Sequence, residues 1–289
     1  MSRSFAVVGV FLVWVGLAVA QDSEQFKPKP VFGKEARVIS YVLDNNHYRK
    51  IKLNDSLSAA ILNRYITELD NSKTYFLASD VKSFDRYKYS IDDLTRNENV
   101  TPAFEIYKVF DQRYKERMNY VLTKLVNQNF DYSIDEYYEP NREKATWATS
   151  KEELNEIWRK IIKSQALSLK LAGKKPDEIT ETLKTRYQRF AKTFSQFTSE
   201  DVFGIYMNSI TEAYDPHTNY MSPKQSDLFK QQMSLSLEGI GAQLQSENDY
   251  TKIVRILPGG DAQKSGKVNE NDLIIAVAQG KDGEMVDVV

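Results

Sequence analysis

Apolar side chains recur every three or four positions from about residue 34 to residue 214. This spacing predicts amphipathic helices, each with one face toward a core. A helix is expected over residues 34–44, and further helices are expected to begin near Asp55 or Ser56, Ser79, Thr101, Ser150, Pro176 and Thr198. Most of these starts offer a capping side chain or a proline in the first turn. The apolar stripes are therefore interpreted as the core of a helical domain rather than as a cofactor site.

The pattern changes in the last part of the chain. From Met233 onward lie 7 of the 12 glycines but only one aromatic residue, Tyr250. Residues 251–257 and 272–278 are predicted strands, separated by a turn at 258–260 and a short helix over 261–265, and a third strand starts at 284. The sequence therefore predicts an α+β protein: an all-α N-terminal helical domain over 34–222, then a β domain over 223–289, with the boundary near 223–236.

The first twenty residues have the features of an export signal. Arg3 precedes an apolar run from Phe5 to Leu17, and Ala18-Val19-Ala20 follows. The run is shorter than the roughly 20 residues that a spanning helix needs. Residues 1–20 are therefore predicted to be a signal peptide that is removed, with a retained membrane anchor as the alternative. Residues 21–33 are expected to form an extended linker.

Charge and composition remove several classes of function. The 39 basic and 40 acidic residues give a net charge of −1, so nothing indicates nucleic-acid binding. The chain has no cysteine, which excludes disulfides and thiolate chemistry and fits an oxidising bacterial envelope. The two histidines, His47 and His217, lack the spacing of a zinc site. We expect no metal and no cofactor, and the residues alone assemble no catalytic constellation.

The segment over 237–244 is the candidate binding site. Its two glycines flank one apolar residue directly before a strand, and glycine permits the positive φ that turns amide groups toward one point. Such a concavity can hold a peptide carboxylate, and the strand can pair with the peptide behind it. An ordinary tight turn explains the glycines about equally well. The expected tail-binding residues are Leu237, Glu238, Gly239, Ile240, Gly241, Ala242, Gln243 and Leu244.

Several segments together resemble one known family. They are residues 77–81, 167–173 and 199–203, the run Asp215-Pro216-His217-Thr218-Asn219-Tyr220, and residues 233–242. The mature chain resembles the tail-specific protease family, within the C-terminal-processing peptidases. The resemblance implies a periplasmic serine endopeptidase that recognises apolar C-termini, built from a helical domain, a PDZ domain and a protease core with a Ser/Lys dyad. His217 would anchor the helical domain rather than transfer protons.

On this resemblance, residues 223–289 are an incomplete PDZ domain, and the chain stops before one groove wall and the whole catalytic core. No catalytic residue is therefore assigned, and the chain alone is expected to lack proteolysis and to bind tails weakly. The implied partners are protein C-termini and a helical-repeat adaptor lipoprotein, without nucleic acid, and with membrane contact only through an uncleaved signal.

Two alternatives remain: a non-catalytic PDZ-type binding or adaptor protein, and a helical scaffold with an incidental β tail. The coding sequence beyond codon 289 distinguishes the protease from both. Binding of free against amidated peptide C-termini separates the two alternatives from each other.

Overall fold

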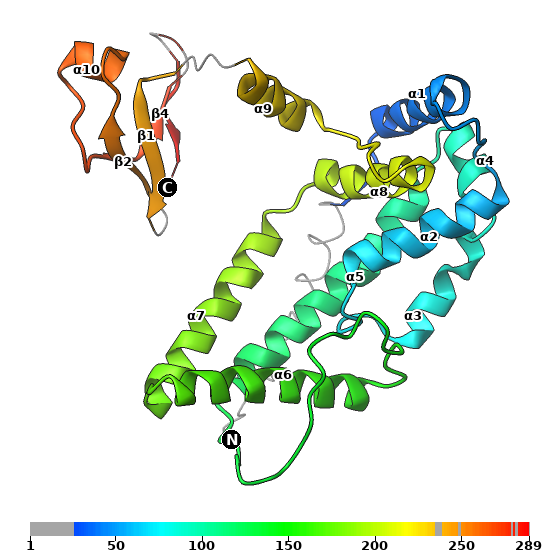
Figure 1. Cartoon of the computed structure of the whole chain (residues 1–289), viewed down its shortest axis with the longest axis horizontal. Helices are drawn as coiled ribbons and strands as arrows, with labels where there is room; N and C mark the ends of the chain where they lie inside the picture. The colour runs from blue at the N-terminus through cyan, green and yellow to red at the C-terminus, as the bar shows by residue number, and fades with distance from the viewer. Residues whose placement is uncertain (1–25, 235–238, 248–249, 279, 281–282, 289) are drawn as a thin grey trace, which may run out of the picture. The chain divides into compact units, whose positions relative to one another are not determined.

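The computed structural model describes residues 26–234, 239–247, 250–278, 280 and 283–288. The chain divides into two compact units, Met1–Tyr220 and Met221–Val289. The first unit is helical and the second carries small antiparallel sheets (Figure 1). The protein is therefore α+β with a helical N-terminal domain, as the hydrophobic spacing predicts. The predicted signal peptide lies outside the described residues, and no helix within them combines the length and apolarity needed to cross a membrane.

The helical unit follows the predicted order of caps and apolar stripes. Its elements are α1 (Pro30–Asn46), α2 (Asp55–Leu69), α3 (Ala78–Ser83), η1 (Phe84–Tyr87), α4 (Ile91–Arg96), α5 (Thr101–Tyr120), η2 (Val121–Leu125), α6 (Lys151–Leu171), α7 (Pro176–Ser195) and α8 (Ser199–Tyr214). Two predicted caps are confirmed, because the side chains of Ser150 and Thr198 accept hydrogen bonds from the third helical amides of α6 and α8.

Three helix starts differ from the prediction. Helix α1 begins at Pro30, inside the expected linker, because proline at the first helical position lacks only an amide that would have no partner there. Helix α2 is capped by Asn54, whose extended backbone lets its side chain accept from the amide of Leu57 at 3.0 Å. Helix α3 begins one residue before Ser79, and the Asp80 carboxylate accepts from its N-cap amide.

The core of the helical unit consists of two clusters. The first joins α1, α2, α4, α5 and α8, and the second joins the end of α5 with η2, α6 and α7. The indole of Trp158 on α6 donates to the carbonyl of Thr74 at 2.7 Å, and the Tyr75 ring packs against both clusters. The two clusters are therefore connected by aromatic side chains and belong to one unit.

The second unit begins with a helix that the sequence pattern did not predict. Helix α9 (Pro223–Met233) is capped by Ser222, so Ser222-Pro223 starts a helix rather than only interrupting one. It is followed by β1 (Ala242–Glu247), β2 (Tyr250–Ile256), α10 (Asp261–Ser265), β3 (Leu273–Ile274), β4 (Ala276–Val277) and β5 (Val286–Asp287).

The strands form two antiparallel sheets. One has the order β1-β2-β3 and the other pairs β4 with β5. The single strand predicted over 272–278 is therefore divided, because Leu273 and Ile274 pair with β2 whereas Ala276 and Val277 pair with β5. This arrangement places β1 at one edge of its sheet, directly after the candidate loop.

Candidate peptide-binding site

The structure describes six of the eight residues of the candidate site. Leu237 and Glu238 lie outside the described residues. Gly239 and Ile240 form a bend that ends at Gly241, and the remaining residues, Ala242 to Leu244, begin strand β1. The described part is thus a glycine-containing loop that runs directly into a strand.

Gly241 is fixed by its backbone conformation and by a close neighbour. Its φ of 74° is in the left-handed region that favours glycine. A Cβ atom at this position would also lie 2.6 Å from the Cα of Gly260. Gly260 is constrained in return, because its own Cβ would lie 2.7 Å from the Cα of Gly241. The sequence pattern assigned Gly260 only to a turn and gave no sign of this backbone-to-backbone contact.

The loop is held in place through its carbonyl groups. The amide of Ala262 donates to the carbonyl of Ile240 at 2.7 Å, and the amide of Leu257 donates to the carbonyl of Gly241 at 2.8 Å. Among the described residues, the amides of Gly239, Ile240 and Gly241 donate to no acceptor. The carbonyls of Ile240 and Gly241 are therefore engaged inside the unit, whereas the three loop amides have no acceptor among the described residues.

Strand β1 has one edge without a partner in the part of the chain that the structure describes. It pairs only with β2, and the pairing shifts register between Gln243 and Leu244. Ile240 is 49% exposed and Leu244 is 44% exposed. An open strand edge offers amide and carbonyl groups to another extended chain. The loop amides, the strand edge and two exposed apolar side chains are thus adjacent along one segment.

The segment after α8 is tied to the segment after α1. The amide of His217 donates to one carboxylate oxygen of Asp215 at 2.8 Å, and the Tyr48 hydroxyl donates to the other. His47 Nε2 lies 3.0 Å from the hydroxyl oxygen of Thr218. These five residues form what we name the Asp215 cluster.

The Asp215 cluster has the geometry of a structural tie. The hydrogen bond from the Tyr48 hydroxyl, followed by that from the His217 amide, holds the pKa of the Asp215 carboxyl below its ordinary value. The same contact raises the pKa of Tyr48. Because both carboxylate oxygens are occupied, the cluster fixes the chain as it leaves α8. The sequence motif over residues 215–220 draws attention to His217. Nothing in the sequence indicates that Tyr48 lies near this motif.

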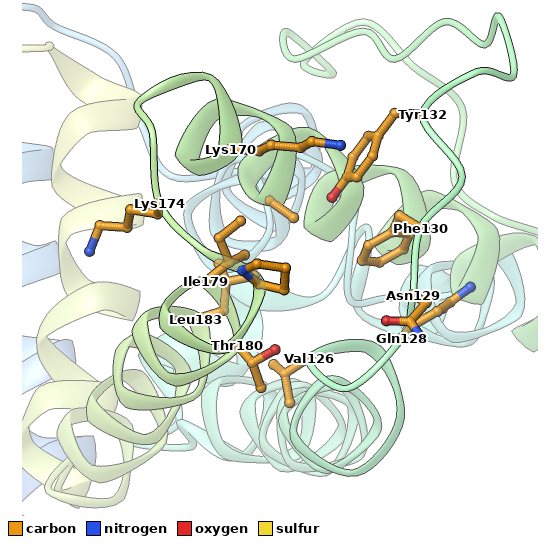
Figure 2. Close-up of a pocket in the computed structure, with 12 residues that line it drawn as sticks. Val126, Gln128, Asn129, Phe130, Tyr132, Lys170, Lys174, Ile179, Thr180 and Leu183 are labelled. Carbon is orange, nitrogen blue, oxygen red and sulfur yellow. The ribbon is translucent and has the colours of Figure 1, made fainter.

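A pocket of about 290 Å³ opens between residues 126–132, α6 and α7 (Figure 2). Val126, Ile179 and Leu183 give it apolar walls. The Lys170 ammonium lies 4.5 Å from the centroid of the Tyr132 ring, whereas that of Lys174 points away and donates to Thr182. The pocket is an apolar recess with a cation at its rim and contains no acid–base pair. Across the described parts of the chain, no three His, Asp or Glu side chains are placed to hold a metal ion.

Comparisons with known proteins agree on one family. The family model described as the tail-specific protease N-terminal domain matches residues 39–224. The chain is 37% identical over 248 residues to the "Tail-specific protease" of Haemophilus influenzae, which covers 86% of this chain and 35% of that relative. It is 32% identical over 103 residues to the "Carboxy-terminal processing protease CtpA" of Bacillus subtilis, covering 35% of this chain and 22% of the relative.

The family match includes most of the helical unit and the Asp215 cluster, and it covers more than half of the chain. The chain spans only about a third of the length of its Haemophilus relative. It belongs to the tail-specific protease family, and its residues 39–224 form the N-terminal domain of that family.

Proposed function

We propose that this chain recognises the apolar C-termini of envelope proteins, as the N-terminal part of an exported C-terminal-processing serine protease. The observation behind this proposal is the hydrogen bonding of the loop at Gly241. The carbonyls of Ile240 and Gly241 accept hydrogen bonds from within the unit, whereas the amides of residues 239–241 have no acceptor among the described residues. Those amides would bind the terminal carboxylate of a substrate, since clustered backbone amides form anion-binding concavities.

The body of the substrate would add to the edge of β1. Strand addition supplies main-chain hydrogen bonds that do not depend on side-chain identity, and neighbouring apolar side chains select the residues of the peptide. The exposed Ile240 and Leu244 are suited to contact an apolar tail. In this proposal residues 223–289 belong to a PDZ-type module.

Hydrolysis would be carried out by residues that this chain does not contain. The Haemophilus relative, whose name states that it is a tail-specific protease, is matched over 35% of its length. We place the Ser/Lys dyad in the remainder of such proteins and assign no catalytic role to any residue here. Export to the periplasm through residues 1–20, a lipoprotein adaptor and a mechanism without metal or cofactor belong to the same proposal.

Nuclear magnetic resonance with isotope-labelled chain tests tail recognition even when binding is weak. A peptide that ends in apolar residues with a free carboxylate should shift the amide signals of Gly239, Ile240 and Gly241. The same peptide with an amidated C-terminus should shift them much less.

A charge placed at the loop provides the matched variant. Ile240→Asp puts a carboxylate beside the expected anion site and should abolish the shifts, whereas Leu273→Asp, on the strand that does not pair with β1, should retain them. Equal shifts from the free and amidated peptides would refute carboxylate recognition by this loop.

A further inference from the structure

The pocket between residues 126–132, α6 and α7, which we name the α6–α7 recess, has an apolar floor (Figure 2). The lining residues that are buried are all apolar: Val126, Ala166, Ile179 and Leu183. Every lining residue with a hydrogen-bonding side chain is half-buried or exposed. A molecule that enters the recess must therefore place apolar atoms on the floor, since a polar group buried there would lose its hydrogen bonds.

Positive charge lies at the rim of the recess. The 12 lining residues include two lysines, Lys170 and Lys174, and no acid. The Lys170 ammonium lies over the Tyr132 ring and has no carboxylate partner in the described part of the chain. Lys174 points away from the recess and donates to a hydroxyl on α7. Lys170 is therefore the cation that a ligand in the recess would meet.

Five carboxylates lie close to the lining residues in sequence, and none of them lines the recess: Asp131, Asp135, Glu136, Asp177 and Glu178. Glu136 forms ion pairs with two basic side chains of α6, and Glu178 accepts from the amide that precedes α7. Asp131 accepts from the amide and the hydroxyl of Ser133, and Asp135 and Asp177 are exposed. The charge of Lys170 is thus available to an anionic ligand.

The backbone that leads into the recess has an unusual turn. In η2 the helix widens to a π-helical turn, and the amide of Val126 donates to the carbonyl of Val121 at 3.0 Å. Such turns are rare and occur frequently at functional sites. The turn directly precedes the wall formed by residues 126–132, so the backbone indicates a binding site at the same place as the charge does.

The size of the recess limits the ligand. Its volume of about 290 Å³ is nearly twice the roughly 150 Å³ of an engineered apolar cavity that holds one benzene ring. The recess therefore accommodates about ten apolar carbons. A single aliphatic side chain of a peptide would fill less than half of it, and a second residue would bring a peptide group against the apolar floor.

We propose that the α6–α7 recess binds a medium-chain fatty acid, with the acyl tail on the apolar floor and the carboxylate beside Lys170. A peptide C-terminus is the poorer occupant on grounds of size. The proposal goes beyond tail recognition, because it concerns another ligand and the helical unit rather than the loop at Gly241.

Nuclear magnetic resonance titration of the whole labelled chain with decanoate, below its micelle concentration, locates the site. The amide signals of residues 126–132 and 176–183 should shift. From hexanoate to decanoate the affinity should rise by up to about fourfold with each added CH₂ group, and it should level off beyond about ten to twelve carbons, once the recess is full.

Matched ligands and variants separate the two ends of the fatty acid. Decanol, which lacks the carboxylate, should bind about fivefold more weakly than decanoate. Lys170→Gln should weaken decanoate about fivefold without affecting decanol, whereas Lys184→Gln, at an exposed site on α7, should change neither. Thr180→Trp should fill the recess and abolish both, whereas Thr185→Trp, on the same helix outside the lining, should bind both.

Absence of shifts over residues 126–132 and 176–183, or equal affinity of the wild type and Lys170→Gln for decanoate, would overturn the proposal. A peptide with an apolar end that shifts these amides more strongly than decanoate would also overturn it, by identifying a peptide tail as the occupant. Because Lys170 is exposed, Lys170→Gln gives a result even if the tryptophan variant unfolds. The signals of residues 239–241 report tail recognition in the same spectra, so either proposal can fail without the other.

Discussion

Replacing Gly33 by alanine is the sharpest test of how α1 is packed. Gly33 lies inside the helix, where alanine is intrinsically better than glycine by about 1 kcal/mol. Propensity alone therefore predicts a more stable protein. The structure predicts the opposite, because an added Cβ would lie 1.9 Å from the carbonyl oxygen of Glu98 and 2.7 Å from its carbonyl carbon.

The magnitude follows from the atoms that must move. The contact has to open from 1.9 Å to at least 3.0 Å, and the opposing atoms belong to the backbone rather than to a flexible side chain. The displacement would also loosen Phe32 and Ala36, which are buried on either side of Gly33. Overpacking of this kind costs up to about 3 kcal/mol. After the gain in propensity, we expect the free energy of unfolding to fall by about 2 kcal/mol.

Urea unfolding followed by circular dichroism at 222 nm measures this difference, because most helices lie in the first unit. Gly204→Ala is the matched control, since Gly204 lies inside α8 and its added Cβ would meet nothing closer than a Tyr220 ring atom at 4.0 Å. The control should gain about 0.5–1 kcal/mol. If Gly33→Ala is as stable as the wild type or more stable, the close approach of α1 to Glu98 is wrong.

Three further predictions concern buried hydroxyls, a tied carboxylate and the loop glycine. Tyr107→Phe should not destabilise the protein, because that buried hydroxyl has no partner among the described residues, whereas Tyr65→Phe should cost about 1 kcal/mol in urea unfolding by removing a 2.8 Å hydrogen bond to a backbone carbonyl. Asp215→Asn should lower stability near neutral pH, and the deficit should shrink as the pH falls below about 4, because the lowered pKa makes the ionised carboxyl stabilising and this contribution is lost on protonation. Gly241→Ala should disturb the amide signals of residues 239–244 and abolish peptide-induced shifts without changing the unfolding of the helical unit, and unaltered shifts would contradict the contact with Gly260.

Much of the helical unit could be predicted from the sequence because local chemistry determines it. The caps at Ser150 and Thr198 and the proline that opens α7 act within one turn of the chain, so spacing alone reveals them. The start of α1 and the existence of α9 were not predicted, because Pro30 and Pro223 each stand at a place where proline either ends a linker or begins a helix. That choice depends on the residues C-terminal to the proline and on tertiary contacts.

The second unit shows where local patterns stop being informative. The run 272–278 has the continuous apolar character of one strand, but its two halves pair with different partners, β2 and β5. The neighbouring strands in the fold decide such a division, and it cannot be predicted from the seven residues themselves. The tie between Tyr48 and Asp215 is likewise a contact across 167 positions, and the sequence contains only its two ends.

The candidate loop explains why a pattern of two glycines is a weak signal by itself. The proposed recognition uses main-chain amides, so the side chains of the loop carry little of the chemistry. Only Gly241 is fixed by the geometry, through its positive φ and through the backbone of Gly260 behind it. The informative pattern is therefore the pair Gly241 and Gly260, separated by the whole of β1 and β2, because their backbones meet where the carbonyls of Ile240 and Gly241 accept hydrogen bonds from within the unit. Tail recognition should accordingly tolerate neutral substitutions at Gln243 and fail when either glycine gains a Cβ atom.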